Sequence, residues 1–279
     1  MTDHVLITTD LDRTLIFSKR ATAQLGGALP ADPVEMPGSS GSTQTAGELC
    51  WAARDAIAAL PGYARLCLAT SRNLTRVARL RLPFEVPYAI AANGGVVLVD
   101  GKPDRQWAGH IQRELAAVAP AGDVQAVLGG YSGEPWLERL GEPDDMCCVA
   151  IVDPAGPPAD QLAEIEQGCS GKGWRASLIG RKLYVFPAAF GKEHAVAYIA
   201  EQMAAFGGQV PRRLAAGDTE HDRAMLEAAD VGWVPAGSDL AGSDLAARVD
   251  AGRIRVTRLP GHAAAAQVTR EWLAECAPR

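Results

Sequence analysis

Two carboxylates, Asp10 and Asp12, stand one residue apart directly after the apolar run Val5–Thr9. That run has the length and the β-branched content of a buried strand. In an open α/β sheet, ligands gather at the carboxyl ends of the parallel strands. A pair of acids at such a place can bind a hard cation, attack an electrophile or transfer protons. Asp10 and Asp12 are therefore the first candidates for chemistry in this chain.

Further polar residues fall at comparable places, either at the end of a predicted strand or at the start of a predicted helix. They are Thr70, Lys192, Asp218 and Asp222. Taken singly, each has an ordinary explanation, because an aspartate or threonine can cap a helix and a lysine can be a solvated surface charge. Their shared position at one edge of a sheet favours a joint functional site.

Strands alternate with helices along most of the chain, which is typical of a doubly wound parallel sheet covered by helices on both faces. The predicted strands are Val5–Thr9, Ala64–Ala69, Tyr88–Ala92, Arg213–Ala216 and Val231–Val234. The predicted helices are Ala46–Leu60, Leu74–Leu82, Glu193–Phe206 and Glu220–Ala229. The turn dipeptide Asn93-Gly94 predicts a hairpin that joins the third strand to Val96–Val99.

From about Pro103 to Pro187 the pattern changes to that of a small α+β module. Its predicted elements are the helices His110–Val118 and Ala159–Cys169 and the strands Met146–Val152, Trp174–Ile179 and Leu183–Phe186. We therefore predict an α/β protein with a discontinuous Rossmann-like core, residues 1–103 and 188–279, and an inserted domain, residues 104–187. The segment Gly26–Gly47 is rich in Pro, Gly, Ser and Thr and is predicted to be a loop.

The composition excludes several classes of protein. The chain has 279 residues, of which 48% are hydrophobic and 22% charged, and its net charge of −6 argues against a broad nucleic-acid interface. No apolar run approaches the roughly 20 residues that span a membrane, and no signal peptide is recognisable, so we expect a cytoplasmic protein. The six cysteines lack metal-binding spacing, and structural disulfides are not expected. The oligomeric state is not predicted.

Four segments resemble, in order, the four motifs of the haloacid dehalogenase (HAD) superfamily. They are Asp10-Leu11-Asp12-Arg13-Thr14, Leu68-Ala69-Thr70-Ser71-Arg72, Gly191-Lys192 and Gly217-Asp218-Thr219-Glu220-His221-Asp222. The resemblance covers nearly the whole chain. A module inserted between the second and third motifs is typical of members with a large α/β cap, which include sugar phosphatases similar to sucrose-phosphate phosphatase. The turn at Asn93-Gly94 also resembles the corresponding turn of those sugar phosphatases.

The resemblance implies a role for each motif. Asp10 is expected to attack phosphorus and form an aspartyl-phosphate, while Asp12 protonates the departing alkoxide and then activates water. The residues implied to hold the phosphate are Lys192, Thr70 and Leu11, the last through its backbone. The implied cofactor is Mg²⁺, which prefers oxygen ligands. The magnesium ligands implied are Asp10, Asp12 through its main-chain carbonyl, Asp218 and Asp222.

Two residues depart from the superfamily's pattern. Arg13 stands where glycine is common, and this long cation either contacts the substrate or points away from the site. His221 stands where asparagine is usual and adds a group that titrates near neutral pH. Arg72 either positions substrate or is a helix-surface arginine. The candidate substrate residues are Arg13, Arg72, Asn93 and Arg181, and further candidates in the cap are Trp136, Arg139, Lys182 and Tyr184.

These features predict a Mg²⁺-dependent phosphatase that acts on a small phosphate ester, either a sugar phosphate or a related phosphomonoester, without a nucleic-acid or membrane partner. A phosphomutase that uses the same intermediate is one alternative. Another is a non-hydrolytic regulatory module that accepts a phosphoryl group or only binds a ligand. Receiver domains are of this kind, but they lack a second acid at the position of Asp12 and have no inserted module.

Overall fold

The structure is a computed structural model that describes residues 4–38, 41–142, 145–247 and 252–277. The chain divides into two compact units. The larger consists of Met1–Pro103 and Lys192–Arg279, and the smaller of Asp104–Gly191. Residues 188–191 thus group with the smaller unit, whereas the sequence assigned them to the larger one.

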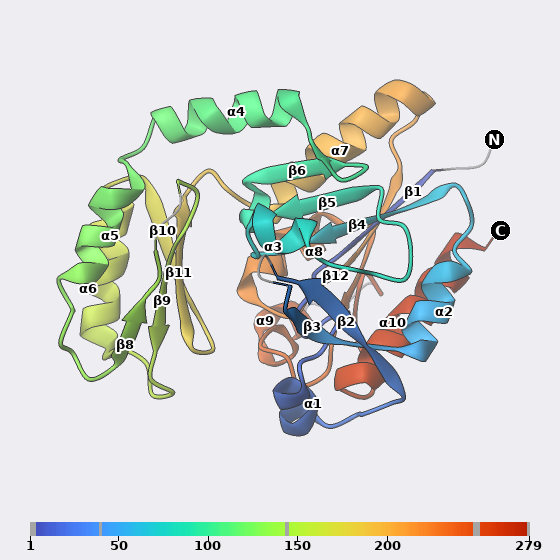
Figure 1. The fold of residues 1–279 in the computed structure, drawn as a ribbon. Coiled ribbons are helices and arrows are strands. Elements are labelled where there is room, and N and C mark those ends of the chain that lie inside the picture. The colour runs from blue at the N-terminus through green and yellow to red at the C-terminus, as the bar shows by residue number, and fades with distance from the viewer. Residues whose placement is uncertain (1–3, 39–40, 143–144, 248–251, 278–279) are drawn as a thin grey trace. The chain divides into compact units, whose positions relative to one another are not determined.

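The larger unit is built on a sheet that has eight strands within the described residues (Figure 1). Their order is β14 (Ile254–Val256), β13 (Val231–Val234), β12 (Arg212–Ala216), β1 (Val5–Thr9), β4 (Ala64–Ala69), β5 (Tyr88–Ala91), β6 (Val96–Val99) and β7 (Lys102–Pro103). Neighbouring strands from β14 to β5 run parallel, and β5, β6 and β7 pair antiparallel. The wholly buried β1 lies between β4 and β12, so the residues that follow these three strands are brought together.

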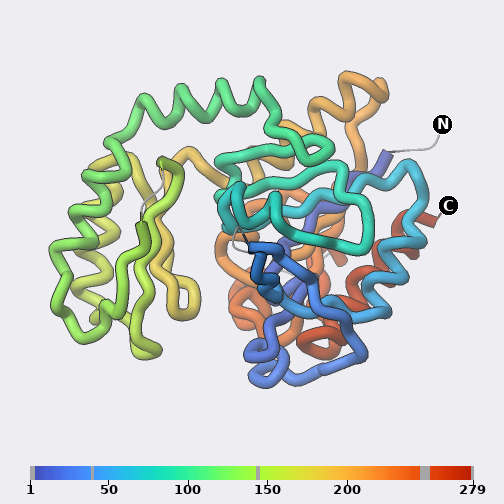
Figure 2. Tube along the Cα trace, in the orientation of Figure 1, coloured from blue at the N-terminus to red at the C-terminus, as the bar shows by residue number. Residues whose placement is uncertain are grey.

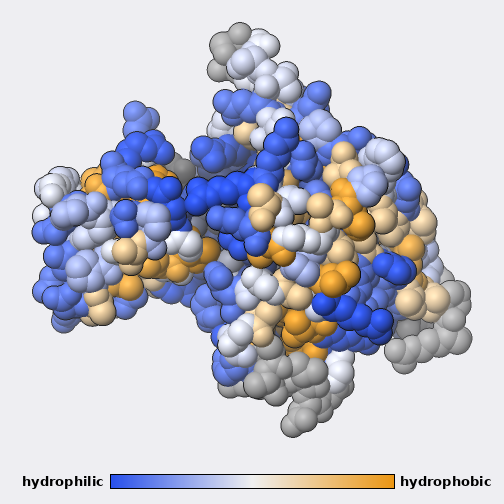
Figure 3. All heavy atoms as spheres, turned by 90° about the horizontal axis from the view of Figure 1, so that it is seen from below, coloured by the Kyte–Doolittle hydropathy of each residue, from blue (hydrophilic) through white to orange (hydrophobic). Residues whose placement is uncertain are grey.

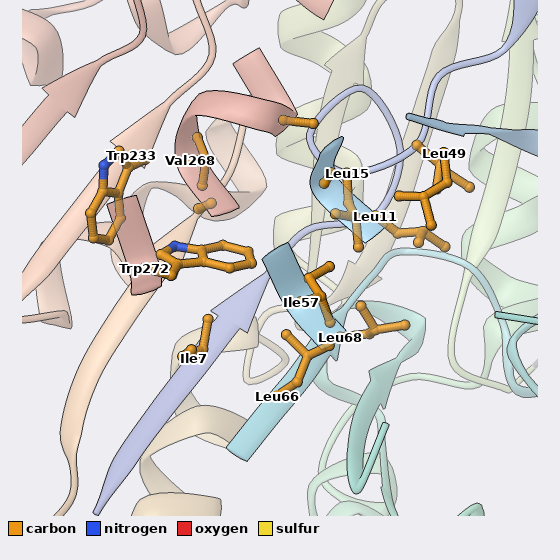
Figure 4. Close-up of a cluster of buried hydrophobic side chains, with 14 of the residues drawn as sticks. Ile7, Leu11, Leu15, Leu49, Ile57, Leu66, Leu68, Trp233, Val268 and Trp272 are labelled. Carbon is orange, nitrogen blue, oxygen red and sulfur yellow. The ribbon is translucent and has the colours of Figure 1, made fainter. Parts of the chain in front are cut away.

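Helices cover both faces of this sheet. The helices of the larger unit are α1 (Lys19–Leu25), α2 (Trp51–Ala58), α3 (Leu74–Ala78), α7 (Lys192–Gly207), α8 (Arg223–Ala228), α9 (Asp244–Ala247) and α10 (Gly261–Cys276), with short 3₁₀ turns at Ala92–Gly94, Glu220–Asp222 and Leu240–Gly242. On one face, Ile7 and Leu66 from the strands share a core with Ile57 of α2 and Trp272 of α10 (Figure 4). On the other face, α7 and α8 pack together against the strands. The predicted α/β class and doubly wound parallel sheet are confirmed.

The smaller unit contains a four-stranded antiparallel sheet. Its strands, in spatial order, are β10 (Trp174–Ile179), β11 (Lys182–Pro187), β9 (Cys148–Val152) and β8 (Leu137–Leu140). Its helices are α4 (Arg105–Ala116), α5 (Ala121–Gly129) and α6 (Ala159–Ser170). Side chains from α5 and α6 form a separate core with the buried residues of this sheet.

The segment after the first motif differs from the prediction. Residues 26–47 were expected to be a loop, but β2 (Ala31–Pro37) and β3 (Thr43–Cys50) pair as an antiparallel hairpin. Figure 2 traces this path from β1 through α1 and the hairpin into α2. The helix predicted from Ala46 begins only at Trp51, because residues 47–50 pair with β2 instead. The prediction of a loop is therefore wrong, and so is the start of this helix.

The ends of the other predicted helices and strands differ less from those in the structure. The helix predicted to end at Leu82 ends at Ala78, and the one predicted over residues 220–229 is a 3₁₀ turn followed by α8. The sequence did not indicate α5, β8 or α10. The hairpin around Asn93-Gly94 is confirmed, since β5 and β6 pair antiparallel across it.

The face in Figure 3 intermingles hydrophilic residues with apolar patches. No helix within the described residues is both long and apolar enough to cross a bilayer. All six cysteines are free thiols, in agreement with the expectation that disulfides are absent.

Candidate active site

The site is built where β1, β4 and β12 end. Asp10 follows β1 directly, and its N–H donates to the carbonyl of Ala216 on β12 at 2.8 Å. The next residues fold into a tight turn, in which the N–H groups of Leu15 and Ile16 both donate to the carbonyl of Leu11. The apolar side chains of this turn are fully buried and hold it against the core. Asp10 is therefore fixed at the centre of the sheet edge.

Lys192, at the start of α7, lies within this site and is 1% exposed. Its Nζ donates to Oδ1 of Asp10 and to Oδ1 of Asp222, both at 2.6 Å. Burying an ammonium group without a partner is costly, and two carboxylates compensate that cost here. Lys192 thus joins the segments that carry the first and fourth motifs.

Asp222 organises the loop after β12. Its Oδ2 accepts hydrogen bonds from the N–H groups of Asp218 (3.1 Å) and Thr219 (3.0 Å) and from the hydroxyl of Thr219 (3.1 Å). A Cβ atom at Gly217 would lie 2.3 Å from the Cβ of Asp222, so only glycine fits there. Asp218 is turned into the site, where Oδ1 accepts from the Thr14 hydroxyl at 3.4 Å. Sequence reasoning gave Thr14 no role, although it belongs to the first motif.

The buried acids have unusual pKa values. Burial raises the pKa of Asp10 to about 7; the adjacent Lys192 acts against this rise, and the negative charges of Asp222 and Asp12 add to it. Burial, followed by the charges of Asp10 and Asp222, also raises the pKa of Asp218 well above its usual value. For Lys192, burial disfavours the ammonium form, but Asp10 and Asp222 outweigh it and raise its pKa. If all three acids were ionised, their negative charge would exceed what one lysine balances, so Asp10 and Asp218 hold their protons to higher pH than usual.

Asp12 lies beside the cluster and is bound by Arg72. The guanidinium donates from Nε to Oδ2 of Asp12 at 2.7 Å and from Nη2 to Oδ1 at 2.6 Å. Thr70 is buried at the end of β4, and its hydroxyl oxygen accepts from the N–H of Arg72 at 3.1 Å. Arg72 is therefore not a helix-surface arginine, which was one of its two predicted roles.

Arg13 adopts a backbone conformation that favours glycine. Its φ is +66°, and its N–H donates to the carbonyl of Ile16 at 2.8 Å, which closes the turn. Its Nε lies 3.8 Å from Oδ2 of Asp218, and its side chain is 41% exposed. The cation expected beside the site is thus near Asp218 rather than directed away from it.

The two remaining candidate substrate residues, Asn93 and Arg181, belong to different units of the chain. Asn93 lies in the turn between β5 and β6, where its N–H donates to the carbonyl of Thr70 at 3.1 Å, and its side chain is buried. Arg181 belongs to the smaller unit, where it pairs with Glu138 and donates to the carbonyl of Val152 at 3.0 Å.

The carboxylate oxygens of the buried acids are suitable ligands for a hard cation. Asp10, Asp218 and Asp222 each offer a carboxylate oxygen, and these oxygens lie within 4.8 Å of one another. Carboxylate oxygens are the ligands that Mg²⁺ prefers. A divalent cation would balance the negative charge that the three acids carry when ionised, and so would favour the ionised forms of Asp10 and Asp218. Asp222 already uses both oxygens in hydrogen bonds, so it fits a supporting role better than direct ligation.

Among the comparisons with known proteins, only the solved structures give matches. No family model matches the sequence, and no curated protein matches it. Among solved structures, the sucrose-phosphatase of Synechocystis sp. PCC6803, in complex with sucrose and phosphate, is similar with a TM-score of 0.64 and 16% identity, covering 98% of both chains.

Two further solved structures point the same way. A trehalose-6-phosphate phosphatase of Aspergillus fumigatus has a TM-score of 0.51 and 13% identity, covering 96% of this chain and 93% of that one. A HAD superfamily phosphatase of Bacteroides thetaiotaomicron has a TM-score of 0.52 and 16% identity, covering 85% and 86%. At these identities the likeness shows the fold alone, which this chain shares with these three structures.

Proposed function

We propose that this chain, whose fold is that of the HAD phosphatases, is a phosphatase that hydrolyses a small phosphomonoester through an aspartyl-phosphate on Asp10. The observation that carries the proposal is the buried cluster in which Lys192 binds Asp10 and Asp222 while Asp218 lies within reach of both acids. Phosphoryl transfer needs a nucleophile, charge neutralisation and a proton donor in one place. Asp10, Lys192 and Asp12 would provide these three functions.

Asp10 is the proposed nucleophile. Its carboxylate oxygen would attack phosphorus as the bond from phosphorus to the ester oxygen breaks, and Asp12 would give that ester oxygen a proton. Water would then attack the phosphorus of the aspartyl-phosphate and lose a proton to Asp12, releasing phosphate and restoring both acids. Asp10 is nearly inaccessible to solvent while the Asp12 side chain is half exposed, which suits one acid for attack and the other for proton exchange.

Lys192 and the backbone would bind the phosphoryl oxygens. The Nζ of Lys192 is held between two carboxylates, so its charge stays in place without reorganisation during the reaction. Thr70 keeps its hydroxyl proton available, because its oxygen accepts from Arg72 and its own donor is not needed for that bond. The backbone at Leu11 would complete this binding site.

Asp10, Asp218 and the main-chain carbonyl of Asp12 would hold Mg²⁺, with Asp222 in support. The bound ion would neutralise the phosphoryl oxygens during transfer. Thr14 would orient the Asp218 carboxylate through its hydrogen bond.

A sugar phosphate is the proposed substrate class, and the smaller unit, Asp104–Gly191, is the proposed cap that would recognise the leaving group. Support comes from the sucrose-phosphatase structure, which shares the fold over 98% of both chains. Within this unit, Tyr184 and Phe186 are stacked with ring centroids 5.7 Å apart, and Lys182 lies over the Tyr184 ring. Phe186 is buried, so the part-exposed Tyr184 and the exposed Lys182 are the residues of this group that would contact a polyhydroxylated ligand.

A screen of phosphate esters with and without Mg²⁺ tests the proposal. The purified protein should release phosphate from at least one sugar phosphate, and only when Mg²⁺ is present. The control is Asp10→Asn, which keeps the size of the side chain and removes the nucleophile. Activity that persists in this variant would show that another nucleophile or a contaminating enzyme is responsible.

A further inference from the structure

The guanidinium of Arg72 joins the Asp12 carboxylate to the β2–β3 hairpin. Besides its two bonds to Asp12, Nη2 donates to the carbonyl of Ala46 on β3 at 3.0 Å. The Arg72 side chain is only 13% exposed, whereas the Asp12 side chain is 49% exposed. One planar group is thus bonded on one side to a catalytic candidate and on the other to the backbone of β3.

The backbone of Arg72 is fixed as well. Its N–H donates to the Thr70 hydroxyl at 3.1 Å, and its carbonyl accepts from the N–H of Ala92 at 2.8 Å. It directly precedes Asn73, which caps α3 by accepting from the N–H of Arg76. The Cα atom from which the Arg72 side chain starts therefore has a set position beside Thr70 and α3.

The hairpin that carries Ala46 is attached to the turn after β1. Phe17 and Glu48 exchange backbone hydrogen bonds of 3.0 and 2.7 Å in the two directions. A Cβ atom at Gly47 would lie 3.2 Å from the Ile16 side chain, so β3 packs closely on this turn. Strand β2 is fixed too, since the N–H of Arg81 donates to the carbonyl of Glu35 at 2.9 Å. The Ala46 carbonyl therefore has a set position relative to Asp12.

We infer that Arg72, anchored on β3 by the Ala46 carbonyl, is a positioning residue that holds the Asp12 carboxylate in the orientation required for proton transfer. A bidentate pair fixes the plane of a carboxylate as well as its place. Arg72 occupies one lone pair on each oxygen of Asp12, and the other lone pairs of this half-exposed side chain remain for a proton. This inference rests on the proposed function. It gives the β2–β3 hairpin the role of anchoring Arg72 through the Ala46 carbonyl.

The dependence of rate on the leaving group tests this role. An alkyl phosphate leaves as a basic alkoxide and needs the proton from Asp12, whereas p-nitrophenolate leaves readily without one. For Arg72→Ala and Arg72→Lys, kcat/KM for a hexose phosphate should fall by about 100-fold, the scale of general acid catalysis. With p-nitrophenyl phosphate the fall should be much smaller. Slow hydrolysis of the aspartyl-phosphate should then give a burst of p-nitrophenolate.

Chemical rescue separates positioning from a purely structural role. Added guanidinium ion, at tens of millimolar, should restore part of the hexose phosphate activity of Arg72→Ala, because it can bind Asp12 and the Ala46 carbonyl together. Sodium chloride at equal ionic strength should not. Arg76→Ala is the matched control, since Arg76 is an exposed arginine one turn further along, and it should keep wild-type selectivity. Thermal unfolding verifies that each variant is folded.

The possible failures are distinguishable. If kcat/KM falls equally for both esters, or if guanidinium restores no activity, the proposed role of Arg72 is wrong. Turnover by the wild-type protein with Mg²⁺ would still support the proposed function in that case. If the wild-type protein hydrolyses neither ester with Mg²⁺ present, the proposed function is wrong and the role of Arg72 falls with it.

Discussion

Lys192 and Asp222 form a buried ion pair in which Nζ lies 2.6 Å from Oδ1, and the second oxygen of Asp222 binds the backbone that carries Asp218. This arrangement makes Lys192 both a support for the fold and a charge for the reaction. Replacing it by an apolar residue leaves Asp10 and Asp222 buried without a counter-ion, and removing one partner of such a pair costs about 3–5 kcal/mol.

Lys192→Met should therefore lower the free energy of unfolding by several kcal/mol, measured by urea denaturation, and lower kcat by about 100-fold or more. The double variant Lys192→Met with Asp222→Asn should recover much of the stability, because one buried charge is removed, and none of the activity. Recovery of activity in the double variant would show that Lys192 acts only as a support.

The backbone at Arg13 predicts a stabilising substitution. At φ +66° a residue with a Cβ atom is strained, and such strain is of the order of 1 kcal/mol or more. Arg13→Gly should therefore be more stable than Arg13→Ala by about 1 kcal/mol in urea denaturation. Both variants lose the guanidinium, so their difference isolates the backbone. Equal stabilities would mean that the turn relaxes when the side chain is removed.

The raised pKa values of Asp10 and Asp218 predict how stability depends on pH. The folded protein keeps protons on these acids that the unfolded chain loses above about pH 4, so their contribution to stability falls as the pH rises from about 4 to about 7. In the absence of divalent cations, Asp218→Asn should weaken this dependence and raise the melting temperature at pH 7.5. An unchanged pH dependence in this variant would contradict the charge repulsion described for the cluster.

The same variant tests metal binding without measuring activity. A Mg²⁺ concentration about 100 times its Kd should stabilise the wild-type protein by about 2.7 kcal/mol, because the ion binds only the folded state. Asp218→Asn should show little of this gain in a thermal unfolding assay, since it removes one proposed ligand. Equal stabilisation of the two proteins would place the bound ion elsewhere.

The proximity of the candidate site residues was largely predictable from the sequence, because parallel strands put their carboxyl ends at one edge of the sheet. Asp10, Thr70 and Asp218 each follow a short apolar run, and these runs became β1, β4 and β12, which are neighbours in the sheet. Lys192 was predicted at a helix start and lies at the beginning of α7. The alternation of strands and helices predicted a parallel sheet, whereas the order that makes these three strands neighbours is seen only in the structure.

What could not be predicted depends on contacts between distant residues. The β2–β3 hairpin has weak alternation, with Val34 and Met36 buried between two prolines, and proline argues against strands. Its partner strand is polar at its start, and the hairpin is held by its bonds to Phe17 and Arg81. The pairing of Arg72 with Asp12, 60 positions away in the chain, likewise leaves no local signal.

The covalent intermediate gives the most direct test of the central claim. Asp12→Asn should slow hydrolysis of the aspartyl-phosphate, so that it accumulates when the variant is mixed with p-nitrophenyl phosphate and Mg²⁺ and quenched in acid. Peptide mass spectrometry should then find one phosphoryl group, located on Asp10, and none in the variant that also carries Asp10→Asn. A phosphoryl group on any other residue, or full turnover by Asp10→Asn, would contradict the proposed mechanism.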